Sequence, residues 1–563
     1  MTALSPDPFP TGGLRELSPR EVMQRTAALA CTLPKDNAPA CTGQVNVGIF
    51  FDGTGNNRLA DYIGIAAEEQ VKAMKAGRSP NAPDSFPDGE RKHSNVVRLF
   101  HAHKVDRDEG FFRFYIPGVG TPFAEIGDDG GGGGSAFGAG GEARILWAFT
   151  RLMNAPFSYV QKDDFMKGAA LKDFIDKQSF DHSGTWQREG ELRRWQDKLQ
   201  GALRGKKPHI TQINLSVFGF SRGAAEARAF TNWLFDACTQ EDGAWLFAGI
   251  PLRVFFLGIF DTVAAVGPGN TTGNDMAKGH WSWGGYMEIH PAIEQCVHFI
   301  AGHEVRGSFS LDSVRIRGSY PPNAKEVMYP GSHSDVGGGY KPGALGVSPT
   351  QGDIMATVAA ANMYLEARLA GVPLLALDEL PEDDRNDLTP SQKVIDDMNA
   401  YLRAANVGDG RAEDMHQRHM SLYHSYRFKY RLSYKQRLWY VRASKEDRPG
   451  LDMTSRSMME RMGSLYGHTF PRNPNYDPKF ALMNHEAAIK SAGMEASYQQ
   501  NIPYQQLRKV MAAIDVNKLS EPIERFFDEY VHDSVAGFYN AGMNEYGLNE
   551  MAIMRFRSIF DKN

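Results

Sequence analysis

Apolar runs bounded by turn residues alternate with helical patterns over roughly the first 340 residues. Continuous apolar runs, typical of strands buried on both faces, lie at residues 44–51, 111–116, 210–218, 251–260, 296–301 and 325–329. Apolar residues at helical spacing separate them, at residues 19–29, 61–75, 142–153 and 225–237. This alternation predicts an α/β fold with a mostly parallel central sheet and helices on its faces.

The pattern changes after about residue 350. Residues 353–370 have helical periodicity, and most of the following chain is helical or irregular and rich in Met, Tyr and Arg. We therefore expect an N-terminal segment (1–43), an α/β catalytic domain (44–350) with a polar helical insertion at about 157–208, and a mainly helical region (351–563). The region 351–563 would be a helical elaboration of the core that forms a lid or docks on a membrane.

Charge and composition narrow the functional classes. The chain has 563 residues, with 62 Lys and Arg against 67 Asp and Glu, for a net charge of -5. This balance argues against nucleic acid as a partner, because nucleic-acid-binding domains are usually basic. Four scattered cysteines without a CxxC pair indicate neither a disulfide framework nor a zinc site. Cys31 and Cys41 are expected as free thiols or, in an oxidising compartment, as one bridge.

The N-terminus lacks a basic stretch followed by an apolar run, so we expect no secretory signal peptide. No run of eighteen apolar residues occurs, so we expect no membrane-spanning helix. Both features predict a protein that is synthesised in the cytoplasm and that leaves it, if at all, by a route without a cleaved signal.

The sequence GFSRG at residues 219–223 is the main candidate for a nucleophile site. GxSxG alone is weak evidence, but here an apolar strand pattern precedes Ser221 and a helical pattern follows it. That context is the one a nucleophile elbow needs, because the sharp strand-to-helix turn pushes the serine side chain out at the end of the strand. The alternative is an ordinary glycine-rich turn. We expect an elbow with Ser221 as the nucleophile.

A serine hydroxyl needs a base, and in α/β-hydrolases the order along the chain is Ser, acid, His. His333 is the best candidate, because it lies in a glycine-rich loop after a strand, in PGSHSDVGGGY. His280, His290 and His298 also follow the serine but lie in less loop-like surroundings, and His303 is the strongest rival.

For the acid we expect Asp261, which ends the apolar run FFLGIFD. A carboxylate at the carboxyl end of a strand can reach an imidazole at the same sheet edge. The alternative for Asp261 is a cap on the following helix. Asp335 is the alternative acid, although it is only two residues from His333 and more plausibly shapes the His333 loop.

The turn-rich stretch DGTGNN follows the first buried strand. An aspartate-nucleophile phosphatase would need a second Asp where Phe50 stands, and a dinucleotide fingerprint would need a third Gly where Arg58 stands. Neither alternative fits. We expect backbone N–H groups of Gly53 and Thr54 to complete an oxyanion hole with the N–H of Arg222.

Two features of the middle of the chain stay open. The glycine-rich stretch at 127–141 is either a flexible linker or a mobile loop beside a site. No metal or other cofactor is required by these motifs, although acidic loop residues such as Asp128 and Asp129 leave calcium possible.

Five blocks taken together resemble a known family. FFDGTGNN, PGVGT, GFSRGAAEARAF, GIFDTVAAVG and PGSHSDVGGGY follow one another between residues 45 and 340. In this order they resemble the catalytic domain of type VI secretion lipase effectors, the first family of antibacterial phospholipase effectors. The resemblance implies an α/β-hydrolase core and phospholipase A activity on bacterial glycerophospholipids, with Ser221 as nucleophile, His333 as the histidine and Asp261 as the acid.

The resemblance also implies partners and a place of action. Effectors of this family are carried by the spike protein of the secretion system into the periplasm of a neighbouring cell, where they act at the phospholipid membrane surface. A cognate immunity protein protects the producer. Membrane docking is attributed to the regions equivalent to residues 351–563, which match less recognisably.

The sequence therefore predicts a phospholipase A-type serine esterase that acts as an antibacterial toxin. One alternative is a carboxylesterase for small soluble esters, which would use the same catalytic residues. The other is a binding component in which the elbow is inactive.

Overall fold

The computed structural model describes residues 2–10, 14–32, 41–132, 134, 138–178, 185–266, 282–464, 470–539 and 553–562.

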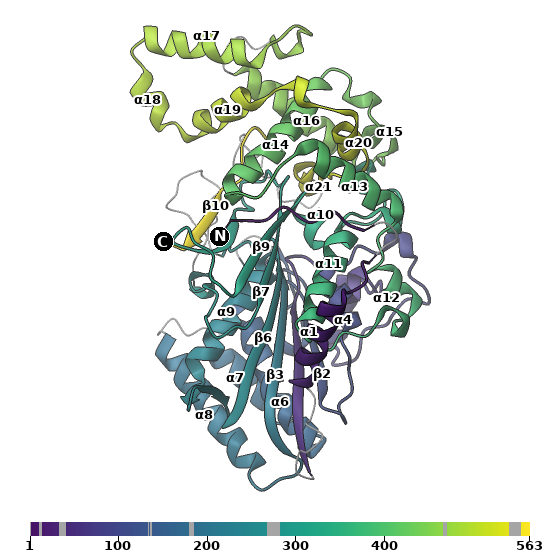
Figure 1. Ribbon diagram of the computed structural model, residues 1–563, viewed down its shortest axis with the longest axis vertical. Coiled ribbons are helices and arrows are strands. Elements are labelled where there is room, and N and C mark those ends of the chain that lie inside the picture. Colours follow the sequence, from purple (N-terminus) through teal and green to yellow (C-terminus); the bar gives the residue numbers. More distant parts are fainter. Residues whose placement is uncertain are drawn as a thin grey trace.

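A six-stranded parallel sheet forms the centre of the molecule (Figure 1). Its strands, in spatial order, are β2 (Phe111–Ile116), β1 (Thr42–Phe51), β3 (His209–Phe220), β6 (Ile250–Phe260), β7 (Cys296–Ala301) and β9 (Ala324–Tyr329). A short antiparallel hairpin, β4 (Thr239–Glu241) and β5 (Ala244–Phe247), extends from β6. The predicted α/β fold with a mostly parallel sheet is confirmed.

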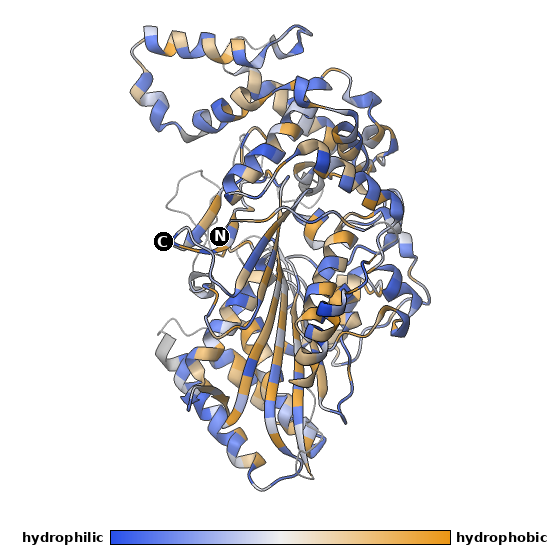
Figure 2. Cartoon of the chain, in the orientation of Figure 1, coloured by the Kyte–Doolittle hydropathy of each residue, from blue (hydrophilic) through white to orange (hydrophobic). Residues whose placement is uncertain are grey.

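One face of the sheet is covered by the helices α6 (Gly141–Gln161) and α9 (Arg222–Ala237). The helices α7 (Gly168–Gln178) and α8 (Thr185–Leu203) pack on the outside of these two. Neighbouring residues of a strand point to opposite faces, and β1 shows this at its end. The Phe51 ring packs against Phe230 of α9, whereas the adjacent Phe50 ring stacks on Phe218 on the other side, with centroids 4.9 Å apart. Most residues of the central strands are apolar (Figure 2), as burial on both faces requires.

The opposite face is covered by α4 (Asn95–Ala102) and α11 (Ala356–Leu369), with α1 (Pro19–Ala30) packed against α11. Short helices α2 (Arg58–Asp61), α3 (Ala67–Lys75) and α12 (Glu382–Asn386) lie in connections. The segment around Leu4 pairs in parallel with Val327 of β9, so the N-terminal segment extends that edge of the sheet.

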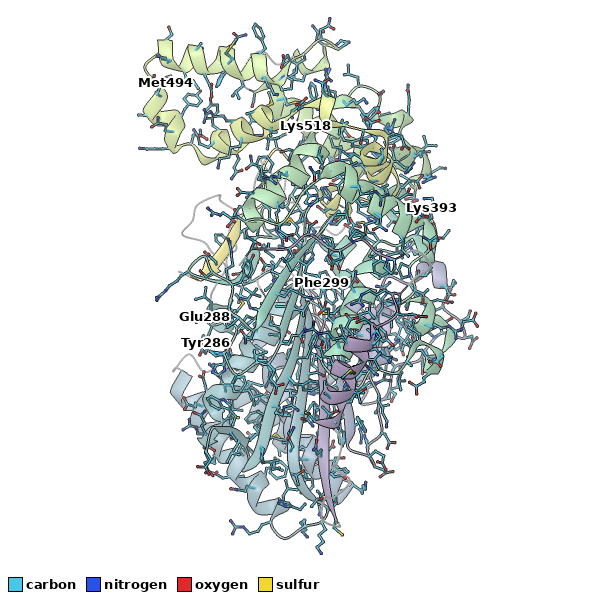
Figure 3. The ribbon with its side chains drawn as sticks, in the orientation of Figure 1. Tyr286, Glu288, Phe299, Lys393, Met494 and Lys518 are labelled. Carbon is cyan, nitrogen blue, oxygen red and sulfur yellow. The ribbon has the colours of Figure 1, made fainter. Side chains whose placement is uncertain are left out.

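Most of the remaining helices gather at the carboxyl ends of the strands (Figure 1). They are α10 (His333–Gly337), α13 (Gln392–Ala405), α14 (Ala412–Lys429), α15 (Leu438–Arg442), α16 (Arg448–Gly463), α19 (Ile502–Ala513), α20 (Glu521–Glu529) and α21 (Ser534–Tyr539). Together with α19, the helices α17 (Pro478–Ser491) and α18 (Glu495–Gln500) form an arm that projects from this end. Met494, which is 47% exposed, lies at the outer turn of the arm (Figure 3).

The expected strands all appear within a few residues of their predicted bounds, but three features differ. The helix expected at 61–75 is split into α2 and α3. The loop expected around His333 begins a one-turn helix, α10. The two-stranded pair of β8 (Leu311–Ile316) and β10 (Ile559–Lys562) was not predicted, because it joins segments nearly 250 residues apart.

Candidate active site

Ser221 stands at the sharp turn between β3 and α9. Its backbone has φ 57° and ψ -125°, a conformation that L-residues rarely adopt. Its N–H donates to the carbonyl of Phe260 on the neighbouring strand at 3.0 Å, which fixes the turn against the end of β6. A strained residue at a strand-to-helix turn, held by its neighbours, is the geometry of a nucleophile elbow.

The two glycines of GFSRG are required by close backbone contacts. A Cβ on Gly219 would lie 2.6 Å from the carbonyl oxygen of Gly223. A Cβ on Gly223 would lie 2.3 Å from the carbonyl oxygen of Asp52 at the end of β1. Only glycine allows α9 to start this close to the sheet.

Asp261 and His333 meet at the same edge of the sheet. Asp261 directly follows β6, and His333 begins α10 four residues after the end of β9. His333 Nδ1 and Asp261 Oδ2 are 2.5 Å apart, and both residues are buried. Because an ionised carboxylate only accepts, the imidazole donates its Nδ1 proton and presents Nε2 as the remaining acceptor.

The serine turn lies beside this pair. The ring of Phe220, which precedes the serine, is 4.6 Å from the His333 ring, centroid to centroid. The carbonyl of Ser221 accepts from Val263, two residues after Asp261, at 3.2 Å. Among the described residues, the serine hydroxyl makes no hydrogen bond. Catalytic hydrogen bonds are often long in enzymes without ligand, so this absence does not exclude His333 as the base.

The charged groups Arg557, Arg306 and Glu304 lie near the Asp261–His333 pair and affect its pKa values. Burial would raise the pKa of Asp261, but Arg557 and His333 hold it well below its ordinary range. Burial lowers the pKa of His333, and its hydrogen bond to Asp261 opposes that shift without cancelling it. The imidazole is therefore neutral at neutral pH, which is the state a general base needs.

Glu304 supports the histidine from the loop after β7. Its Oε2 accepts the backbone N–H of His333 at 3.2 Å and the Nη2 of Arg306 at 3.0 Å, and its Oε1 accepts the Ser534 hydroxyl at 3.1 Å. Burial would raise the pKa of Glu304, but Arg306 lowers it to about 2. A carboxylate that is ionised at neutral pH thus holds the start of α10 through the His333 N–H.

The alternative acid, Asp335, is placed elsewhere. Its Oδ1 lies 2.5 Å from His532 Nδ1, and its Oδ2 accepts the N–H and the hydroxyl of Ser332, each at 2.8 Å. The His333 imidazole has its partner in Asp261 instead. Asp335 therefore shapes the loop that carries His333 and ties it to the segment before α21.

The rival histidines have other partners. His298 Nε2 accepts from the N–H of Thr262, and its Nδ1 faces Glu326 at 2.9 Å. His303 Nδ1 accepts from Gly331, and its Nε2 faces a tyrosine hydroxyl. His290 stacks on Phe235, with centroids 4.1 Å apart. His280 lies outside the described residues.

The expected oxyanion donors differ in availability. The Gly53 N–H donates to the Asp52 carboxylate at 2.8 Å, so this donor is already used. The Thr54 N–H has no hydrogen-bond partner in the described part of the chain, and the Thr54 hydroxyl accepts from Arg222 Nε at 2.6 Å. The backbone of Arg222 begins α9 directly after Ser221. Thr54 and Arg222 thus lie together, and Gly53 is a partner of Asp52 instead.

Asp52 is itself unusual. It is buried, and the Tyr115 hydroxyl donates to its Oδ2 at 2.6 Å. Burial raises the pKa of Asp52 to about 7, against the lowering effect of its hydrogen bonds. This carboxyl group therefore links the start of the loop that carries Thr54 to Tyr115 of β2.

One buried arginine ties together the segments that follow β2. Arg144 of α6 donates to the carbonyls of Pro117 and Thr121 and to Asp128 Oδ2, at 2.7, 2.9 and 2.6 Å. Asp129 pairs with a lysine at 2.9 Å. Within the described residues, no group of three or more His, Cys, Asp or Glu side chains is arranged to hold a metal ion.

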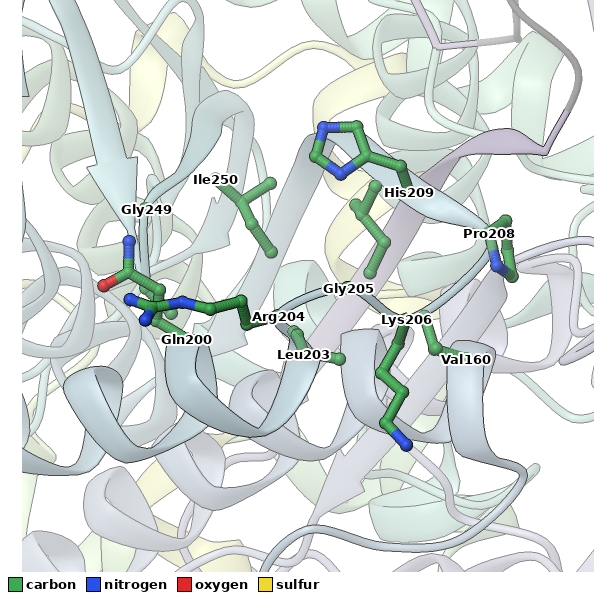
Figure 4. Close-up of a pocket in the computed structure, with 12 residues that line it drawn as sticks. Val160, Gln200, Leu203, Arg204, Gly205, Lys206, Pro208, His209, Gly249 and Ile250 are labelled. Atoms are coloured by element: carbon green, nitrogen blue, oxygen red, sulfur yellow. The ribbon is translucent and has the colours of Figure 1, made fainter.

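A cavity of about 280 Å³ lies far from this site, at the amino-terminal ends of β3 and β6 (Figure 4). Arg204, Lys206 and His209 line it, but their side chains diverge instead of converging on one point (Figure 4). It shares no residue with the Ser221 site. We assign it no function.

Three residues of the site were not found from the sequence. Glu304 and His532 lie in stretches without a recognisable motif, and Arg557 lies in the segment before β10. Arg557 donates from Nη1 and Nη2 to the two oxygens of Asp261, each at 2.7 Å. Its separation of 296 residues from Asp261 leaves no local pattern that could reveal the contact.

Comparison with known proteins identifies the family. The model of the catalytic domain of Tle1-like phospholipase effectors of the type VI secretion system matches residues 46–239 and 239–365. These ranges include Ser221, Asp261 and His333. No curated protein matches the sequence significantly.

Two solved structures match the chain to different extents. An uncharacterized protein from Pseudomonas aeruginosa superposes with a TM-score of 0.75 at 22% sequence identity, covering 100% of this chain and 85% of that one. This likeness supports the fold. The Tle1 effector bound to the VgrG spike of the type VI secretion system matches at 25% sequence identity. The match covers 54% of this chain and 52% of that one, with a TM-score of 0.26.

Proposed function

Because the chain belongs to the Tle1-like phospholipase effector family of type VI secretion, we propose that it is a serine hydrolase of the phospholipase A type. Ser221 is the nucleophile, His333 the general base, and Asp261 the acid that orients the base. The observation that carries this assignment is the 2.5 Å contact of His333 Nδ1 with Asp261 at the sheet edge where the strained serine turn stands.

The proposed steps use these three residues in the order of a serine esterase. Ser221 Oγ attacks the acyl carbonyl carbon of the ester, and His333 Nε2 takes the hydroxyl proton. The tetrahedral intermediate collapses as the imidazolium gives this proton to the leaving lysophospholipid alcohol. Water then attacks the acyl-enzyme, with the imidazole again as base, and releases the fatty acid. Asp261 stays ionised throughout and stabilises the imidazolium.

The oxyanion is held by backbone N–H groups at the start of α9 and in the loop after β1. The Arg222 N–H and the Thr54 N–H are the two donors we assign. The helix α9 is 16 residues long, and the positive end of its dipole faces the position of the oxyanion. Gly53 is not assigned a direct role, because its N–H is bonded to Asp52.

The substrate class is inferred from the family and from the surface. Family membership indicates a phospholipid, and phospholipase A specificity is the simplest use of an acyl-transfer site. The arm formed by α17–α19 exposes Phe480, Met483 and Met494, at 57%, 56% and 47%, among several lysines. We propose that this arm rests on an anionic membrane surface. No helix in the described ranges is long and apolar enough to cross a bilayer.

The helical region 351–563 is proposed as a cover for the catalytic edge of the domain 44–350. Residues after 351 reach the site at several points: His416 Nε2 donates to the Glu304 carbonyl, the Ser534 hydroxyl donates to the Glu304 carboxylate, and Arg557 donates to Asp261. Within 44–350, we propose the polar stretch 157–208 as an insertion. Its helices α7 and α8 nevertheless contribute apolar side chains to the hydrophobic core.

As a type VI secretion effector, the protein is proposed to be carried by a spike protein and to act as an antibacterial toxin in the periplasm of the target cell, with a cognate immunity protein in the producer. A pull-down of the chain with a spike protein, and protection of a sensitive strain by a candidate immunity protein, would test these two partners separately.

The decisive assay is fatty-acid release from vesicles of defined phospholipids. Wild type should release fatty acid, and Ser221→Ala and His333→Ala should each lose at least about 10³-fold. Ser334→Ala is the matched control, because this serine lies next to His333 and has no assigned role. Positionally labelled chains distinguish sn-1 from sn-2 cleavage.

The same assay separates the alternatives. Hydrolysis of soluble short-chain esters without release from vesicles would favour a carboxylesterase. Equal activity of wild type and Ser221→Ala on every substrate would show an inactive elbow and refute the proposal.

A further inference from the structure

A buried arginine from the far end of the chain grips the carboxylate of Asp261. Arg557 Nη1 donates to Oδ1 and Nη2 to Oδ2, each at 2.7 Å, so the contact is bidentate. The Arg557 side chain is completely buried. A catalytic triad does not need such a partner, since its acid has only to face the imidazole.

The position of this arginine is fixed by the fold on both sides. The following residues form β10, which pairs in parallel with β8. The Arg557 Nε donates to the carbonyl of Phe309 at 2.5 Å, and the carbonyl of Arg555 lies 3.1 Å from His424 Nε2 of α14. The segment is thus anchored to the sheet side and to the helical side of the site.

The arginine completes the coordination of the carboxylate. Oδ1 accepts from the Ala301 N–H at 2.8 Å and from Arg557, and Oδ2 accepts from His333 and from Arg557. Each oxygen therefore has two donors, and the plane of the carboxylate is fixed by four hydrogen bonds. Since the imidazole is oriented through Oδ2, rotation of the carboxylate would turn the base away from the serine.

The arginine also changes the charge that the histidine experiences. The groups that face the Asp261–His333 pair are Arg557 from the segment before β10, Arg306 and Glu304 from the loop after β7, and His416 from α14. Glu304 is paired with Arg306. Burial and Arg306 lower the pKa of His333, and Glu304 and Asp261 raise it. Arg557 partly neutralises the negative charge of Asp261, so the Asp261–His333 pair binds a second proton less readily.

We propose that Arg557 is a positioning residue of this site: it orients the Asp261 carboxylate toward His333 and, as a buried positive charge, extends the range over which the imidazole stays a neutral base toward acidic pH. This inference rests on the proposed serine-hydrolase function. Loss of the charge should let the Asp261–His333 pair take up a proton at higher pH, and the protonated pair cannot activate the serine.

The test is the pH dependence of inactivation by a fluorophosphonate, which reacts with an activated serine and does not depend on membrane binding. Arg557→Gln should move the acidic limb of the profile upward by about 1 pH unit or more and lower its plateau. Arg557→Lys keeps the charge but not the two parallel hydrogen bonds. It should therefore leave the limb near that of wild type and lower the plateau at least about tenfold.

Arg555→Gln is the matched control, because Arg555 lies on the same segment with its guanidinium against Gly307. Its limb should coincide with that of wild type. The proposal is overturned if the acidic limb of the Arg557→Gln profile coincides with that of wild type. It is also overturned if the acidic limb of Arg557→Lys is shifted as far as that of Arg557→Gln. If Arg557→Gln does not fold, Arg557→Lys decides alone, since a wild-type plateau in that variant would exclude a positioning role. Failure of the wild type to react at Ser221 refutes the proposed function instead.

Discussion

Substitution of Gly223 by alanine should damage the site through the backbone alone. The added Cβ would lie 2.3 Å from the Asp52 carbonyl oxygen and 2.4 Å from that of Phe51, and neither backbone oxygen can turn away as a flexible side chain does. Van der Waals contact requires a retreat of about 1 Å at the start of α9. We expect a loss of about 3 kcal/mol in the free energy of unfolding, the cost of overpacking a tight core.

Activity should fall further than stability alone would explain. The serine immediately precedes α9, so a retreat of the helix moves the nucleophile and one oxyanion donor together, and a displacement of about 1 Å costs about 10²-fold in rate. The assays are urea unfolding and fatty-acid release from vesicles, measured where both proteins are fully folded. Gly190→Ala is the control: Gly190 lies in α8 with open space around its Cβ position, and alanine there should stabilise by about 0.5–1 kcal/mol. If Gly223→Ala were as stable and as active as wild type, the close packing of α9 on β1 would be refuted.

Three further predictions concern strain, the His333 loop and pH. Ser221→Gly should abolish activity yet stabilise the fold by about 1 kcal/mol in urea unfolding, because glycine adopts this positive φ without strain; a destabilised variant would contradict the strained elbow. Asp335→Asn should cost about 2 kcal/mol and at least tenfold in fatty-acid release, because a buried ionic hydrogen-bond network is lost; unchanged values would exclude its role in the loop. Burial lowers the pKa values of His416, His419 and His424 to about 4, 3 and 4. The unfolded chain therefore binds more protons below pH 6.5, and stability should fall as the pH decreases from 6.5 toward 4, by up to about 4 kcal/mol per pH unit for the three together. Urea midpoints that stay constant from pH 7 to 5 would contradict this.

The placement of Ser221, Asp261 and His333 at one edge of the sheet could be predicted because local patterns specify it. Continuous apolar runs indicate strands buried on both faces, and in a parallel sheet the residues that follow such strands meet at one edge. Ser221 and Asp261 follow β3 and β6, which are neighbours, and His333 follows β9, two strands further on. The order of motifs along the chain therefore carried information about their positions in space.

The rest of the site could not be predicted because it depends on pairing between distant segments. Arg557, His532 and Glu304 are single residues without periodic or turn signals. The contacts of Arg557 with Asp261, of His532 with Asp335 and of Ser534 with Glu304 arise only when the helical region folds onto the sheet edge. The occupied Gly53 N–H has a similar cause. Its acceptor is the carboxylate of the adjacent Asp52, whose rotamer depends on the hydroxyl of Tyr115 on another strand.

The central claim is that Ser221 is a nucleophile activated by the buried Asp261–His333 pair. It is tested most directly by mass spectrometry of the protein after reaction with a fluorophosphonate at neutral pH. We predict one phosphonyl adduct per chain, mapped to the peptide that contains Ser221 and absent from His333→Ala under the same conditions. An adduct on another residue, or an equal rate of labelling of Ser221 without the imidazole, would contradict the account.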